Sequence, residues 1–191
     1  MKICVFCGSS FGKDEAYRQA AELTGKLLAQ RGIELIYGGG HVGLMGVIAD
    51  AVLSEGGQVT GVIPRALAER EIAHKGLTTL VVVESMHERK AEMAKRADGF
   101  ISLPGGAGTL EEAFEQWTWA QLGVHQKPSG FLNMKGYFDP LRAMIKKMVT
   151  EGFLKPEYAD MLVFFDDPAR ILSAFESYAP PSRKWASGLK M

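Results

Sequence analysis

The sequence has no excess of charge of either sign. Its 191 residues carry 22 Lys and Arg against 22 Asp and Glu, so bulk charge does not attract the chain to nucleic acid or to a membrane. No apolar run approaches the roughly 20 residues of a membrane-spanning helix, and the N-terminus enters a strand pattern directly. We therefore expect a cytoplasmic protein that binds neither nucleic acid nor membrane.

Cysteine and histidine are also scarce. Cys4 and Cys7 form a CxxC pattern, but a redox-active pair of this kind sits at a helix N-terminus, where the helix dipole lowers the thiol pKa. Here both lie in an apolar segment typical of a strand, and their odd separation places them on opposite faces. We expect two buried free thiols. The four histidines, at positions 41, 74, 87 and 125, lack metal-ligand spacing, so no metal site is expected.

Strand and helix patterns alternate along most of the chain. Strands are predicted near 2–7, 33–37, 58–63, 78–83, 99–103, 128–133 and 161–165. Helices are predicted near 14–31, 43–55, 86–97, 108–122, 138–151 and 167–177. This alternation is typical of an α/β fold with a Rossmann-like, doubly wound parallel sheet and helices on both faces. We expect one domain over 1–178, followed by a flexible tail over 179–191.

Glycine clusters follow three of these strands, at 8–10, 38–40 and 105–108. Ligands of doubly wound sheets bind beyond the carboxyl ends of the strands, near the point where the strand order reverses. The sequence therefore predicts a pocket at this edge of the sheet. Its candidate wall residues are Gly8, Ser9, Gly39, Gly40 and Met86, with Met93 and Trp119 as further candidates for the part that selects the ligand.

The segment Gly38–Gly43 satisfies the GxGxxG pattern of dinucleotide-binding proteins. Such a site also needs an acidic residue at the end of the next strand, for the ribose hydroxyls. That strand is followed by Pro64 and Arg65 instead. We expect these glycines to serve tight turns and close approach to a ligand rather than NAD binding.

The segment 105–109 joins a buried strand to a helix and is the better candidate for a phosphate site. Backbone N–H groups and the helix dipole favour an anion there, although no Lys-Ser/Thr follows, as a P-loop requires. Glu111, Glu112 and Glu115 lie in the first turns of that helix. They either stabilise the helix N-terminus or face another part of a bound ligand.

Two cations interrupt the apolar stripe of the helix predicted over 86–97. Met86, Met93, Ala94 and Ala97 form that stripe, and Arg89 and Lys90 fill its gap. One interpretation is that both side chains reach the surface along their aliphatic stems. The other is that they line a cleft and meet an anionic ligand or a carboxylate, because an unpaired buried charge is costly.

Two long motifs and two short ones resemble a known family. Residues 104–112 match the PGGxGTxxE motif of the LOG (Lonely guy) family, and residues 86–90 match its MHxRK motif. Its early Gly-Ser-Ser and Tyr-Gly-Gly-Gly turns correspond to Gly8–Ser10 and Tyr37–Gly40. The resemblance extends from about residue 2 to 175 in the family's order and spacing. Members are cytokinin riboside 5′-monophosphate phosphoribohydrolases, often mislabelled lysine decarboxylases.

This resemblance implies hydrolysis of the N-glycosidic bond of adenosine 5′-monophosphate (AMP), or of an N6-substituted AMP, to free base and ribose 5-phosphate. It implies a Rossmann-like homodimer with active sites near the subunit interface and no cofactor. Arg89 and Glu112 fall on the family's catalytic pair. The implied substrate-binding residues are Glu71, Lys90, Gly105, Gly106, Ala107, Gly108, Thr109, Leu110, Glu111 and Thr118.

The residues make chemical sense of this reaction. Positive charge develops on the ribose in the transition state, and Glu112 could stabilise it or orient the attacking water. Arg89 is expected to keep Glu112 ionised by lowering its pKa. A carrier that binds a nucleotide or phosphoester cofactor without catalysis is the alternative, which the presence of both residues disfavours. A decarboxylase dependent on pyridoxal phosphate has little support, because no lysine is marked for the cofactor. Trp117 and Trp119 could be core residues or part of a dimer interface.

Overall fold

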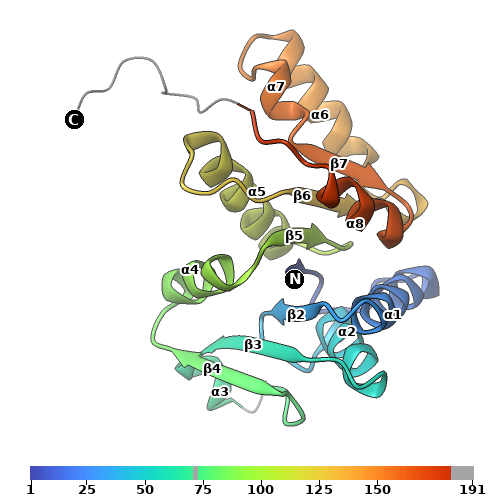
Figure 1. The fold of residues 1–191 in the computed structure, drawn as a ribbon, viewed down its shortest axis with the longest axis vertical. Helices are drawn as coiled ribbons and strands as arrows, with labels where there is room; N and C mark the ends of the chain where they lie inside the picture. The colour runs from blue at the N-terminus through green and yellow to red at the C-terminus, as the bar shows by residue number, and fades with distance from the viewer. Residues whose placement is uncertain (71–72, 182–191) are drawn as a thin grey trace.

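A computed structural model describes residues 1–70 and 73–181 of the chain (Figure 1). Its seven-stranded sheet is parallel throughout and has the order β4-β3-β2-β1-β5-β6-β7. The strands are β1 (Lys2–Phe6), β2 (Glu34–Tyr37), β3 (Val59–Pro64), β4 (Thr79–Val83), β5 (Gly99–Ser102), β6 (Ser129–Leu132) and β7 (Leu162–Phe165). All seven predicted strands are confirmed.

The six predicted helices are confirmed as well. They are α1 (Glu15–Gln30), α2 (Gly43–Ser54), α4 (Met86–Arg96), α5 (Ala107–Leu122), α6 (Asp139–Thr150) and α8 (Pro168–Glu176). Three short elements were not predicted from the sequence: α3 (Arg65–Ala68), the 3-10 turn η1 (Met134–Gly136) and α7 (Pro156–Ala159). Each has at most four residues, which is too short for a helical period to register.

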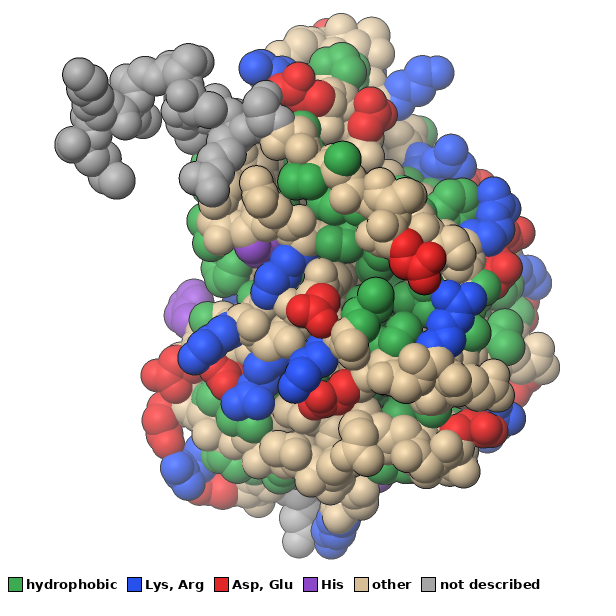
Figure 2. Space-filling model, in the orientation of Figure 1, with side chains coloured by type: hydrophobic (Ala, Val, Ile, Leu, Met, Phe, Trp, Pro, Cys, Tyr) green, Lys and Arg blue, Asp and Glu red, His purple; other side chains and the backbone are tan. Residues whose placement is uncertain are grey.

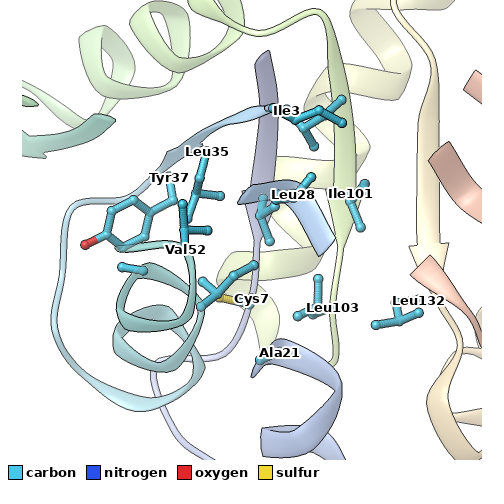
Figure 3. Packing of buried hydrophobic residues seen from close by; sticks show 14 of the residues in the cluster. Ile3, Cys7, Ala21, Leu28, Leu35, Tyr37, Val52, Ile101, Leu103 and Leu132 are labelled. Carbon is cyan, nitrogen blue, oxygen red and sulfur yellow. The ribbon is translucent and has the colours of Figure 1, made fainter. Parts of the chain in front are cut away.

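Helices cover both faces of the sheet, as a doubly wound fold requires. In Figure 1, α1 and α2 lie on one side of the strands and α4 and α5 on the other. The first core contains buried residues of α1, α2 and α8, and the second contains buried residues of α4, α5, α6 and α7. Figure 3 shows side chains of the first core, where Ile3 and Leu35 from strands gather with Leu28 of α1 and Val52 of α2.

Alternate side chains of the segment 3–7, which covers most of β1 and the residue after it, enter the two cores on opposite faces of the sheet. Ile3, Val5 and Cys7 join the first core, whereas Cys4 and Phe6 join the second. Both cysteines are buried and free, as predicted. Burial raises the pKa of both thiols, so they stay neutral at physiological pH.

The strand order reverses at β1, whose neighbours are β2 and β5. The loops after β1 and β5 therefore run side by side, and the Gly8 N–H donates to the Pro104 carbonyl over 3.1 Å. The start of α2 joins them, because the Leu44 N–H donates to the Gly8 carbonyl over 3.0 Å. The carboxyl edge of the sheet thus brings together loops that are far apart in the sequence.

The surface agrees with the balanced composition. On the face seen in Figure 2, basic and acidic side chains are intermingled rather than separated into areas of one charge. Within the described residues, no helix is both long enough and apolar enough to cross a membrane. Most of the tail predicted over 179–191 lies outside the described residues.

Helices α1 and α2 pack closely through Gly25. A Cβ at this position would lie 2.7 Å from both the Ala51 Cβ and the Ile48 carbonyl oxygen. We expect Gly25→Ala to lower the free energy of unfolding by about 1–3 kcal/mol, because the helices must separate to admit a methyl group. Urea denaturation measures this change. Gln19→Ala, at an exposed position of the same helix, should stay within about 0.5 kcal/mol of the wild type. Equal stability of Gly25→Ala and the wild type would contradict the close packing.

Candidate active site

The centre of the site is an ion pair between two helices. Arg89 of α4 places Nη1 3.0 Å from Oε1 of Glu112 of α5. The same guanidinium donates from Nε to the Val62 carbonyl over 3.1 Å. The two side chains are only 11% and 12% exposed. Arg89 therefore connects the end of β3 to the first turns of α5 from a nearly dry position.

Gly38, at the end of β2, makes room for this arginine. A Cβ built at Gly38 would lie 2.0 Å from Nη2 of Arg89, so any other residue here would displace the guanidinium from its present position. From the sequence, Gly38 was expected to serve a tight turn and close approach to a ligand. Its close approach to Arg89 depends on an arginine about fifty positions away, so a local motif does not indicate it.

A second buried cation lies beside the first. Lys90 Nζ contacts the carboxylates of Glu111 and Glu115, the latter at 3.0 Å. Hydrogen bonding to Glu111 raises the pKa of Lys90 and outweighs the effect of burial. Both interior cations of α4 thus meet carboxylates of α5. This agrees with the second interpretation of Arg89 and Lys90, in which they meet a carboxylate rather than reach the surface.

Met86 was assigned to the apolar stripe of this helix, but its side chain is exposed. It occupies the first position of α4, where no packed turn precedes it.

The pKa of Glu112 moves opposite to the expected direction. Burial raises it, and the negative charge of Glu111 adds to the rise. Arg89 lowers it, but by less than burial raises it. Arg89 thus lowers this pKa, as expected, but the rise caused by burial, which the sequence did not indicate, is larger.

The glycine turn before α5 leaves a helix N-terminus without a side-chain cap. The helix begins at Ala107 after Gly106. Helices α2 and α6 also lack a side-chain cap, whereas α1, α4 and α8 are capped by Asp14, Ser85 and Asp167. The first N–H groups of α5 are therefore available to a ligand.

The glycines of this turn differ in their surroundings. A Cβ at Gly105 would lie 2.1 Å from the buried Thr109 hydroxyl oxygen and 2.8 Å from the Gly8 nitrogen. A Cβ at Gly106 or Gly108 would meet nothing within 4 Å. The protein's own packing thus requires glycine only at 105, while 106 and 108 border open space that a ligand can enter.

A pocket of about 300 Å³ adjoins this turn. Gly8, Ser9, Gly105 and Gly106, all among the predicted site residues, line it together with Tyr137. The Tyr137 hydroxyl donates to the Gly105 carbonyl over 2.7 Å. Tyr137 was not among the predicted site residues, because it follows a short turn after β6 and lies outside every motif.

Other predicted residues lie apart from this centre. The turn at Gly39 and Gly40 packs against residues 73–74 through the His74 N–H bond to the Gly39 carbonyl and a Gly40–Ala73 bridge. Thr118 is exposed six residues after Glu112 on α5, about 9 Å along the helix axis. Glu71 lies outside the described residues.

The aromatic and apolar candidates for the pocket wall are mainly core residues. Met93 and Trp117 belong to the second core, and the Trp117 ring N–H donates to the Tyr158 carbonyl over 2.8 Å. Trp119 is partly buried against the same core. Trp117 and Trp119 were expected to be either core residues or part of a dimer interface, and Trp117 is a core residue.

Known proteins resemble this chain over nearly its whole length. A probable cytokinin riboside 5′-monophosphate phosphoribohydrolase of Oryza sativa subsp. japonica is 48% identical over 99% of this chain and 78% of its own length. A cytokinin riboside 5′-monophosphate phosphoribohydrolase of Arabidopsis thaliana is 48% identical over 97% of this chain and 87% of its own length.

Solved structures with the same fold have much lower identity. A molybdenum cofactor binding protein of Rippkaea orientalis superposes with a TM-score of 0.69 at 18% identity, over 92% of this chain and 95% of that one. The molybdenum cofactor carrier protein of Chlamydomonas reinhardtii gives 0.69 at 19% identity with the same coverage. At this identity the likeness concerns the fold alone.

The family model described as "Possible lysine decarboxylase" matches residues 45–175, which include Arg89, Lys90 and the whole glycine turn. Together with the near-half identity to plant phosphoribohydrolases, this match shows that the chain belongs to the LOG family.

Proposed function

We propose that this protein hydrolyses the N-glycosidic bond of AMP or of an N6-substituted AMP. The observation that carries the proposal is the nearly buried Arg89–Glu112 pair, one turn inside a helix whose glycine-rich N-terminus lacks a side-chain cap. The relatives named above carry the corresponding activity in their names. A phosphate at the turn would place the attached ribose near the first turns of α5.

In this reaction the N-glycosidic bond breaks with its electron pair going to the base nitrogen, which takes up a proton. A water oxygen adds to the anomeric carbon and loses a proton, giving ribose 5-phosphate. N–H groups at the start of α5 hold the 5′-phosphate. Glu112 faces the ribose, stabilises its developing positive charge and orients the water. Arg89 fixes the position of Glu112 and keeps enough of it ionised.

The remaining contacts of the site assist this arrangement. Lys90 pairs with Glu111 and Glu115 and offsets part of their negative charge, and its own positive charge lowers the pKa of Glu112. This pairing keeps Lys90 protonated, whereas a Schiff-base lysine must lose its proton to attack a carbonyl. Lys90 is therefore a poor candidate for the cofactor lysine of a decarboxylase.

The Arg89–Glu112 pair also favours a hydrolase over a carrier. A carrier needs the phosphate cradle but has no use for a buried carboxylate beside it, because desolvating that charge costs free energy. The molybdenum cofactor proteins share the fold at 18–19% identity, which carries no argument for their ligand. We therefore propose a hydrolase rather than a carrier protein.

We expect Glu112→Gln to lower kcat for base release about 100-fold or more while nucleotide binding stays within a few-fold, since the carboxylate acts mainly in the transition state. Chromatography of free base from AMP and from an N6-prenylated AMP measures turnover. Glu176→Gln, at an exposed position of α8, is the matched control and should keep wild-type rates. Full activity of Glu112→Gln would overturn its role, and no base from either nucleotide with the wild type would overturn the hydrolase itself.

The raised pKa of Glu112 predicts the acid side of the pH profile. Because the ionised form is needed, kcat/KM, which reports the pKa values of the free enzyme, should fall as pH decreases through a pKa above the ordinary glutamate range. Glu111→Gln removes one of the charges that raise this pKa, so its acid limb should move to lower pH. Arg89→Lys should pair less closely with Glu112 and so lower the pKa of Glu112 by less. The acid limb of the activity that remains in this variant should therefore move to higher pH. Steady-state rates over pH 4–8 (about the stable range of most proteins) measure both shifts, and shifts in the same direction would contradict this account.

We further propose a homodimer in the cytoplasm. The edge strand β4 exposes Leu80 and Val82, and Met86 is exposed at the start of α4, only three residues before Arg89. Apolar side chains exposed on consecutive elements are typical of a surface that a partner covers.

We expect sedimentation equilibrium of the wild type at micromolar concentration to give twice the chain mass. Leu80→Lys combined with Val82→Lys should shift the protein to monomers, because charged side chains are disfavoured at the centre of an interface. Leu23→Lys, at an exposed apolar position of α1, should stay dimeric. A monomeric wild type would contradict the proposed dimer.

A further inference from the structure

The peptide between Gly105 and Gly106 is the first link of the glycine turn and lacks side chains on both sides. Two consecutive glycines leave such a peptide free to rotate, because neither residue restricts its backbone dihedrals. In this structure the Tyr137 hydroxyl donates a hydrogen bond of 2.7 Å to the carbonyl oxygen of this peptide, which belongs to Gly105. A tyrosine outside every motif thus contacts the most adaptable part of the proposed phosphate cradle.

Peptide planarity converts this contact into an orientation of the neighbouring N–H. The carbonyl and the N–H of a trans peptide point in opposite directions, and no described peptide bond is cis. With its carbonyl drawn toward Tyr137, this peptide points the Gly106 N–H away from Tyr137. Rotation of the peptide by half a turn would instead present a carbonyl oxygen, which repels a phosphate.

Tyr137 is itself held on several sides. Its ring meets Tyr17 edge-on at 5.6 Å and Phe138 at 5.0 Å. The Phe138 N–H donates to the Asn133 side-chain oxygen over 2.7 Å. The preceding turn contains Lys135, whose φ of 56° lies in the left-handed region and whose ammonium contacts Asp14, the cap of α1. The hydroxyl is therefore preorganised and need not be recruited when a ligand arrives.

We propose that Tyr137 is a positioning residue that fixes the Gly105–Gly106 peptide in its anion-binding orientation. This inference rests on the proposed function, because it assigns the turn to the 5′-phosphate. Tyr137 touches neither the ribose nor the base in this arrangement. Its loss should weaken ground-state and transition-state binding of the phosphate equally, which changes KM and leaves kcat nearly constant.

The test compares Tyr137→Phe with the wild type by calorimetric titration and by steady-state kinetics. We expect the dissociation constants of inorganic phosphate and ribose 5-phosphate to rise about threefold to tenfold, as for loss of one hydrogen bond. KM for AMP should rise by the same factor, with kcat within about twofold and adenine binding unchanged. Tyr158→Phe is the matched control, because its buried hydroxyl has no hydrogen-bond partner among the described residues; it should alter none of these constants.

Three outcomes would overturn the role of Tyr137. These are unchanged phosphate binding, a fall in kcat at constant KM, or equal weakening of adenine and phosphate, which indicates general loosening of the fold. If the wild type binds phosphate but releases no base, the proposed hydrolase is wrong, and the phosphate constants alone still decide the role of Tyr137. A wild type that binds neither phosphate compound would overturn the cradle and this inference together.

Discussion

The pairing of two interior cations of α4 with carboxylates of α5 is the constraint around which the carboxyl edge of the sheet is organised. Arg89 and Lys90 occupy positions that would otherwise be apolar, and their charges are tolerated there because Glu112, Glu111 and Glu115 meet them. Removal of either Arg89 or Glu112 would leave the other charge nearly dry and uncompensated. The two helices are therefore fixed relative to each other by their charges as well as by their apolar contacts in the second core.

The same constraint gives the two carboxylates next to each other on α5 different properties. Glu111 is exposed and contacts Lys90. Glu112 is nearly buried, contacts Arg89 and has a raised pKa. A carboxylate that is desolvated but oriented interacts strongly with a positive charge that develops beside it, because little water screens the attraction. Of the pair, Glu112 is thus the one suited to a cationic transition state.

The sequence predicted the sheet and its main helices because their signals are local. Apolar runs bounded by glycine indicate the strands, and the odd spacing of Cys4 and Cys7 is sufficient to place them in opposite cores. The motifs also located the glycine turn and the cations. The missing parts depend on contacts between distant segments: Tyr137 reaches Gly105 across 32 positions, and no periodicity encodes such an encounter. The motif indicated that Arg89 lowers the pKa of Glu112, but it did not indicate the burial that raises this pKa by more.

Gly38 has a consequence for how sequences of this kind are interpreted. The turn after β2 carries a pattern that a motif search assigns to a dinucleotide, yet the space beneath its first glycine is filled by the Arg89 guanidinium. The glycine makes room for a side chain of the protein itself. A glycine-rich signature can therefore record the shape of an internal neighbour, and its meaning depends on whether an arginine from a later helix occupies the gap.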